Sequence, residues 1–139
     1  MNPYRDVRKF HEATGLVVND EPILSVDERL LTLREELHYE EYKECVEAFD
    51  EIRYGTADQV EEGFVKLADG ICDLIYVLAG TAVSLGIPLE ECWAEVQRSN
   101  MSKIPEDGVI RRREDGKILK PETFSPPNLR KVIFDSEQQ

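Results

Sequence analysis

Apolar side chains recur at helical spacing along most of this chain and predict an all-α fold. The longest run predicts a helix over residues 25–54 that ends before Gly55; its apolar positions are Leu30, Leu33, Leu37, Val46, Phe49 and Ile52. A second long helix is expected over 56–85, because Gly86 follows it. Shorter helices are expected over 5–14, 89–102 and 128–134. The pattern therefore predicts a four- to five-helix bundle.

The sequence after residue 103 changes character. Asp115-Gly116, between two β-prone runs, is a dipeptide that favours a tight turn, so a small C-terminal β-hairpin is expected over 109–120. We expect one domain over 1–139, with a helical core over 25–103, and with the hairpin and a short last helix over 104–139. The C-terminal half of the second long helix is apolar on nearly every face, which predicts dimerisation through the long helices.

Charge and composition exclude some classes of function. The chain has 139 residues and a formal net charge of −12, which argues against a nucleic-acid partner because binding DNA or RNA phosphates requires clustered Lys and Arg. Cys45, Cys72 and Cys92 lack metal-ligand spacing and are expected to be buried in a reducing compartment. The sequence shows neither a signal peptide nor a comfortable membrane span, so we expect a cytoplasmic protein without a membrane partner.

Acidic side chains interrupt the apolar faces of both long helices; they are Glu40, Glu41, Glu44, Asp69 and Asp73. An ionised carboxylate in a helix-packing surface is costly unless a cation compensates it. The glutamates alone are also consistent with a solvated helix face. The aspartates decide for a metal site, because aspartate is a poor helix former and both lie in an apolar run. A set of oxygen ligands favours Mg²⁺, with Mn²⁺ as a substitute, over zinc.

A second group of residues is basic or polar. Asn100 and Lys103 end the fourth helix, and the expected hairpin contains Arg111, Arg112, Arg113, Lys117 and Lys120. In so acidic a chain these cations predict a local positive field that suits phosphate oxygens. The alternative is a solvated edge hairpin whose charges prevent aggregation. For the arginines both interpretations stay open.

His11 and Tyr76 are weaker candidates for substrate contact. A lone histidine on the first helix is more often a packed or capping residue than a catalyst. Tyr76 lies one turn after Asp73, so it either borders the acidic site or packs in the core.

These motifs together resemble the all-α nucleoside triphosphate pyrophosphohydrolases of the MazG-like superfamily, which includes dimeric dUTPases and phosphoribosyl-ATP pyrophosphohydrolases. The closer resemblance is to a small MazG-like subgroup with dUTPase-type activity. It covers most of the chain, in the segments Phe10-His11-x-x-x-Gly15, Arg34, Glu40-Glu41-x-x-Glu44, Asp73-Leu74-Ile75-Tyr76-Val77, Ser99-Asn100-Met101-Ser102-Lys103 and Asp115-Gly116-Lys117-x-x-Lys120-Pro121.

The chain departs from the superfamily at one position. The usual pattern is Glu-x-x-Glu followed by Glu-x-x-Asp on the next helix, but Gly70 stands three residues before Asp73. Asp69 can substitute for the missing glutamate from the neighbouring position. The departure leaves the number of metal ions and their ligands open.

The resemblance implies Mg²⁺-dependent cleavage between the α- and β-phosphates of a (d)NTP, with dUTP or dCTP as substrates by analogy. It also implies a homodimer or a dimer of dimers that clears unwanted nucleotides from the pool. Glu40, Glu41, Glu44, Asp69 and Asp73 would hold metal, and Glu41 and Glu44 would be catalytic. The residues expected to bind substrate are Asn100, Lys103, Arg113, Lys117, Lys120, His11 and Tyr76.

Two other functions fit less well. A di-iron bundle needs two Glu-x-x-His motifs; Glu35-x-x-His38 is one, but Arg8 stands three residues before His11. A non-catalytic dimerisation or regulatory module with a structural metal has its best support in Gly70. Pyrophosphate release from a nucleotide panel separates this module from the enzyme.

Overall fold

The computed structural model describes residues 1–135; the last four residues of the domain expected over 1–139 lie outside the described part. Its helices are α1 (Pro3–Thr14), α2 (Glu28–Tyr54), α3 (Ala57–Leu85), α4 (Leu89–Met101) and α5 (Leu129–Phe134). The chain forms two compact units, Met1–Ile87 and Pro88–Gln139. The prediction of an all-α fold is confirmed, and every expected helix is present.

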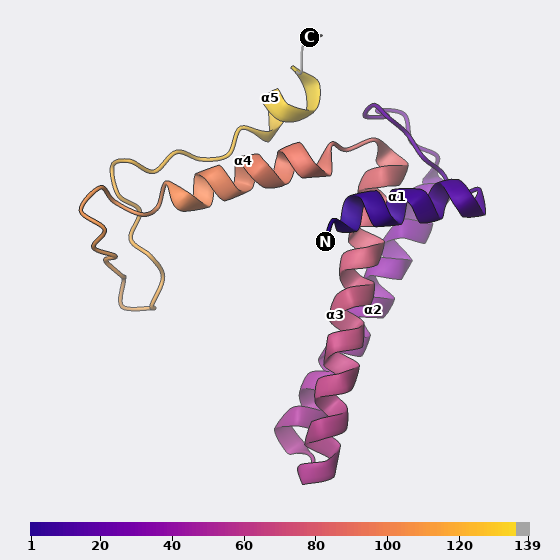
Figure 1. Cartoon of the computed structure of the whole chain (residues 1–139), viewed down its shortest axis with the longest axis horizontal. Coiled ribbons are helices and arrows are strands. Elements are labelled where there is room, and N and C mark those ends of the chain that lie inside the picture. Colours follow the sequence, from indigo (N-terminus) through magenta and orange to yellow (C-terminus); the bar gives the residue numbers. More distant parts are fainter. Residues whose placement is uncertain (136–139) are drawn as a thin grey trace. The chain divides into compact units, whose positions relative to one another are not determined.

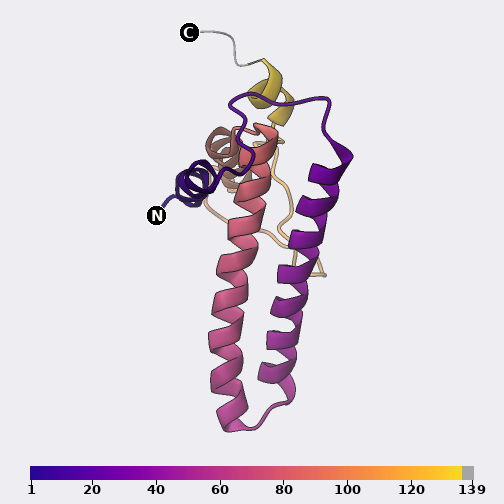
Figure 2. The same ribbon diagram turned by 90° about the vertical axis from the view of Figure 1, so that its right-hand side faces the viewer.

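In the first unit, α2 and α3 lie side by side as an antiparallel pair (Figure 2). Glycines on α3 allow the close approach: a Cβ at Gly63 would lie 2.9 Å from Ile52 Cγ1, and one at Gly70 would lie 3.0 Å from Cys45 Sγ. Because carbon atoms in packed interiors rarely come so close, a larger residue at either position would push α2 away. The same contacts fix the register of the two helices.

Helix α1 crosses the C-terminal half of α3 (Figure 1). Its side chains Val7 and His11 are buried. Outside this contact, the rings of Phe10 and Tyr76 meet edge to face, with centroids 5.8 Å apart. The helix ends at Gly15, whose φ of 72° lies in the left-handed region that glycine adopts without strain.

The loop between α1 and α2 closes the C-terminal end of α3. The backbone N–H groups of Asn19 and Ile23 donate to the carbonyls of Val83 and Leu85 at 3.0 and 3.1 Å. These bonds satisfy carbonyls that the helix end leaves without a partner. Gly86 follows with a φ of 70° and packs against the backbone of the same loop. The loop is therefore an integral part of the first unit.

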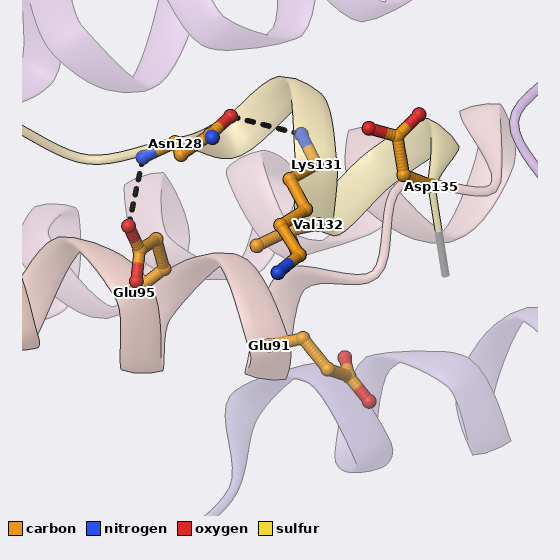
Figure 3. A pocket seen from close by; sticks show the side chains of 6 residues that line it. All are labelled: Glu91, Glu95, Asn128, Lys131, Val132 and Asp135. Carbon is orange, nitrogen blue, oxygen red and sulfur yellow. Dashed lines mark hydrogen bonds between the residues drawn. The ribbon is translucent and has the colours of Figure 1, made fainter. Parts of the chain in front are cut away.

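In the second unit, Glu95 joins α4 to α5. Its carboxylate accepts a hydrogen bond from Arg98 at 2.7 Å. It accepts another from the Asn128 N–H, also at 2.7 Å (Figure 3). The Arg98 bond and then the Asn128 bond lower the pKa of Glu95 to about 2. A hollow of about 570 Å³ lies at this contact, and its other lining residues are Glu91, Lys131, Val132 and Asp135. None of the predicted site residues lines it.

The expected β-hairpin is wrong. Asp115-Gly116 does form a turn, in which the Gly116 N–H donates to the Arg113 carbonyl at 2.9 Å. Beyond the turn, one isolated antiparallel bridge joins Arg112 to Ile118, and the described residues contain no strand. A lone two-stranded ribbon is marginally stable without a third strand or a helix to cover it. All residues over 106–120 are exposed, so nothing in the second unit supplies that cover.

An exposed apolar stripe runs along α3. Its large side chains lie at helical spacing and are each 43–60% exposed; they are Phe64, Ile71, Ile75 and Leu78. Within the described residues, α3 is the one helix long and apolar enough to span a membrane, and a third of its most apolar window is buried. Length and composition alone are weak support for a membrane span, because core helices of soluble proteins meet the same criteria. Asp69 and Asp73 also lie within this helix.

The cysteines are free. Cys45 and Cys92 are buried as expected, whereas Cys72 is exposed, which corrects the expectation that all three are buried. Cys72 neighbours the apolar stripe of α3 in sequence, and a single chain leaves that face uncovered.

Candidate functional site

The five predicted acids lie on the facing segments of α2 and α3. Contact between Cys45 and Gly70 sets residues 40–45 of one helix against 69–74 of the other. Glu41 is half-buried, whereas the remaining acids are exposed; these are Glu40, Glu44, Asp69 and Asp73. The expectation that the acids sit inside the helix-packing surface therefore holds for Glu41 alone.

Glu41 is the electrostatic centre of this group. Burial is the largest cause that raises the pKa of Glu41, followed by the charges of Glu44 and Asp73 and then those of Glu40 and Asp69. Acids of both α2 and α3 therefore act on Glu41. Like charges so close together disfavour the ionised form of Glu41, and a cation would reverse that penalty.

The donor set is chemically suited to Mg²⁺ or Mn²⁺, which prefer carboxylate oxygens. Within residues 1–135, however, no three Asp, Glu, His or Cys side chains lie close enough to hold one ion. Most of the acids are exposed, so their side chains can change rotamer. The residues fit a divalent cation by their chemistry, and the ligand set stays a prediction.

Close packing of α2 against Gly70 explains why no glutamate stands three residues before Asp73. The position faces α2, where Cys45 Sγ occupies the space that a side chain would need. A glutamate at this position therefore requires a smaller residue at 45 or a wider separation of the helices. Asp69 lies next to it on α3 and is close enough to raise the pKa of Glu41.

His11 and Tyr76 lie in the same unit as the acids. His11 is buried, and its Nδ1 donates to the Val17 carbonyl at 3.0 Å. Tyr76 is 39% exposed, one turn after Asp73, and contacts Phe10. His11 therefore packs against α3 at Gly80, and Tyr76 lies between that contact and Asp73 along α3.

The other predicted substrate contacts belong to the second unit. Lys103 Nζ donates to Asn100 Oδ1 at 2.8 Å, so these two residues act as a pair. Arg113 forms an ion pair with Asp115, and the ammonium of Lys120 lies 4.5 Å from the ring centroid of Phe124. The backbone N–H of Lys117 donates to Asp115 Oδ1 at 3.1 Å. Local partners therefore engage several of the cations that the sequence assigned to phosphate binding.

Arg34 is a buried charged residue to which the sequence pattern assigned no role. Arg34 is buried, donating through Nε to Thr81 Oγ1 at 3.0 Å and through Nη2 to the Val77 carbonyl. Burial lowers the pKa of its guanidinium. The signal was its spacing: Arg34 stands seven residues before Glu41, two turns along the same face of α2.

An all-α chain whose two long helices carry acids on facing segments is consistent with the MazG-like superfamily of nucleoside triphosphate pyrophosphohydrolases. The sequence profile of the phosphoribosyl-ATP pyrophosphohydrolase family matches residues 7–100, and the chain belongs to that family. It is therefore an enzyme of the pyrophosphohydrolase class, a hydrolase acting on phosphoric anhydrides. A search of curated proteins finds no match to the chain.

Proposed function

We propose that the protein is a Mg²⁺-dependent nucleoside triphosphate pyrophosphohydrolase that cleaves the bond between the α- and β-phosphates. The observation that carries this proposal is the shared acidic face, where acids of both α2 and α3 raise the pKa of the half-buried Glu41. The family match supports the same chemistry. The products are a nucleoside monophosphate and pyrophosphate, and Mn²⁺ substitutes for Mg²⁺.

In this proposal Glu41 is the general base. Glu41 is the half-buried acid at the centre of the group, and in this proposal its carboxylate accepts the proton of the attacking water. The water oxygen then bonds to the α-phosphorus as the bond to the bridging oxygen breaks, and pyrophosphate leaves with that electron pair. Glu40, Glu44, Asp69 and Asp73 are the proposed metal ligands together with Glu41. Bound Mg²⁺ would neutralise phosphate charge and lower the pKa of bound water.

The proposed donors to phosphate oxygens are polar and basic residues after position 99. Asn100 and Lys103 already pair through their side chains, which orders both for a common ligand. Lys117, Lys120 and Arg113 lie on the exposed segment that follows. Charge-assisted hydrogen bonds from these groups would stabilise the leaving pyrophosphate.

The proposed substrates are dUTP or dCTP, by analogy with the subgroup that the motifs resemble. The family description adds phosphoribosyl-ATP as a further substrate to test. We also propose that the enzyme acts in nucleotide-pool clearance in the cytoplasm, without nucleic-acid or membrane partners.

We propose that the protein is a homodimer or a dimer of dimers. The exposed stripe Phe64, Ile71, Ile75 and Leu78 is a contiguous apolar face of the kind that monomers rarely expose. A second copy of α3 would cover it and also bury Cys72. Sedimentation equilibrium tests this assignment, and a monomer mass at micromolar concentration would contradict it.

The experiment that tests the function is a nucleotide panel assayed for pyrophosphate release with and without Mg²⁺. The panel contains the common dNTPs and NTPs, dUTP and phosphoribosyl-ATP, and the proteins are wild type and Glu44→Gln. We expect release from at least one nucleotide, dependent on Mg²⁺ and reduced roughly 100-fold or more in Glu44→Gln. The absence of release from every nucleotide would favour a non-catalytic helical module instead.

A further inference from the structure

Arg34 is a buried charge with neutral partners only. Arg34 is 7% exposed, and its guanidinium donates to the Thr81 hydroxyl and the Val77 carbonyl. Among the described residues no carboxylate pairs with it. Buried guanidinium groups are costly unless their hydrogen bonds and charge are satisfied. The guanidinium of Arg34 can therefore donate to one more hydrogen-bond acceptor.

The guanidinium has a nitrogen available for that acceptor. Nε and Nη2 have partners, but Nη1 has none within the described chain. In the same residues no fully buried side-chain nitrogen or oxygen lacks a hydrogen-bond partner. Nη1 therefore keeps some solvent-accessible area, although Arg34 as a whole is 7% exposed.

His11 presents a complementary atom beside it. A carbonyl can only accept, so the contact with Val17 places the proton of the imidazole on Nδ1. Nε2 of the neutral ring is then an acceptor, and it too has no partner within residues 1–135. His11 is 3% exposed, and because fully buried unpartnered nitrogens are absent from the described residues, Nε2 keeps some of that accessible area.

Gly80 brings the two side chains together. A Cβ at this position would lie 2.5 Å from Arg34 Nη2 and 3.0 Å from His11 Nε2. Arg34 of α2 and His11 of α1 therefore both pack against the α3 backbone at Gly80, which has no side chain. The guanidinium of Arg34 and the imidazole of His11 are therefore neighbours at the junction of three helices.

The position of this pair relative to the acids suits a nucleotide. Arg34 precedes Glu41 by two turns on α2, and Gly80 follows Asp73 by two turns on α3, which is about 10 Å along either helix. Tyr76 lies between, with its partly exposed ring against that of Phe10. This separation is comparable to the span from the 5′ phosphate of a nucleotide to the far edge of its base.

We infer that Arg34 and His11 recognise the base of the nucleotide, with Arg34 Nη1 donating to a ring acceptor and His11 Nε2 accepting from a neighbouring N–H. The inference rests on the proposed function, because the acids must hold the phosphate end. Adjacent donor and acceptor atoms occur on the hydrogen-bonding edge of a nucleobase and are absent from the phosphate chain. Tyr76 and Phe10 flank the ring and provide aromatic contact. Arg34 is thereby a specificity-determining residue.

Binding is tested by NMR on the full-length protein, with the Arg34 Nε–Hε signal assigned through Arg34→Lys. The probes are dUMP, dCMP and dAMP, each compared with 2-deoxyribose 5-phosphate, in the presence of Mg²⁺. We expect at least one nucleotide to shift the Arg34 and His11 side-chain signals, and the base-free sugar phosphate to shift only amides near Glu41 and Asp73. Nucleotides that leave Arg34 and His11 unmoved, by binding elsewhere or not at all, would overturn the inference.

Kinetics separate recognition from folding. His11→Asn retains a donor at the place of Nδ1, for the Val17 carbonyl, but removes Nε2, and Arg34→Met removes the guanidinium. For each we expect the ratio of kcat/KM for the best nucleotide to that for 2-deoxyribose 5-triphosphate to fall roughly 10- to 100-fold. An equal loss on both substrates in His11→Asn would show a merely structural role. Failure of wild type to release pyrophosphate from any nucleotide refutes the proposed function, whereas the NMR titration still decides on base binding.

Discussion

Glu41→Gln is expected to reduce kcat for pyrophosphate release by roughly 10²- to 10⁴-fold, the usual contribution of a general base. The substitution keeps the size and shape of the side chain but removes the proton acceptor and one proposed metal ligand. Acids on both helices surround Glu41. Substitution of Glu41 should therefore reduce kcat more than substitution of any other single acid in the group. Steady-state pyrophosphate release on the best nucleotide measures the effect.

The same variant should stabilise the metal-free protein. Because the pKa of Glu41 is raised in the folded state, ionisation costs stability, and this cost is absent below the ordinary pKa and develops as the pH rises through the raised one. Glutamine has no charge to lose, so its advantage in Tm over wild type should be larger at pH 8 than at pH 4. Glu35→Gln is the matched control, since Glu35 is an exposed acid on the same helix that does not raise the pKa of Glu41. Full activity of Glu41→Gln, or equal effects of both substitutions, would count against the role assigned to Glu41.

Gly86→Ala is expected to lower the free energy of unfolding by about 2–4 kcal/mol, the largest stability effect predicted here. A left-handed φ of 70° is strained for alanine, and the new Cβ would overlap the carbonyl of Glu21. Either the loop or the end of α3 must move, which would also disturb the hydrogen bonds from Asn19 and Ile23. Urea unfolding followed by circular dichroism measures the loss.

Gly15→Ala separates the two causes of that loss. Gly15 has nearly the same conformation, with a φ of 72°, but a Cβ there would meet no atom within 4 Å. Only the backbone strain applies, so the expected loss is about 1 kcal/mol. Equal losses at the two positions would mean that the contact between Gly86 and the loop does not contribute to stability.

Helix positions could be predicted from the sequence because local signals decide them. Gly15 and Gly86 end α1 and α3 in the left-handed conformation that glycine favours, and Thr56 with Gln59 forms a capping box at the start of α3. The turn at Asp115-Gly116 was predicted for the same local reason. The prediction of a hairpin around this turn was wrong, because strand pairing depends on packing partners that turn residues do not specify.

Burial in the site was harder to predict. Periodicity shows which residues share a face of a helix, but not what covers that face, so Asp69 and Asp73 were expected inside and lie exposed in the single chain. Arg34 shows the opposite case. A charged residue is normally expected at the surface, but the absence of a side chain at Gly80 leaves space for the guanidinium of Arg34 in the interior. Such contacts join positions far apart in sequence, and spacing within one helix cannot reveal them.

The central claim is that acids of α2 and α3 jointly bind one divalent-metal site, and Mn²⁺ titration followed by NMR tests it most directly. Paramagnetic Mn²⁺ at substoichiometric concentration should broaden the amide signals around Glu41 and Glu44 together with those around Asp69 and Asp73. Asp73→Asn should weaken the broadening on both helices at once. Broadening confined to one helix, or spread evenly over remote exposed acids such as Asp50 and Glu61, would contradict a shared metal site.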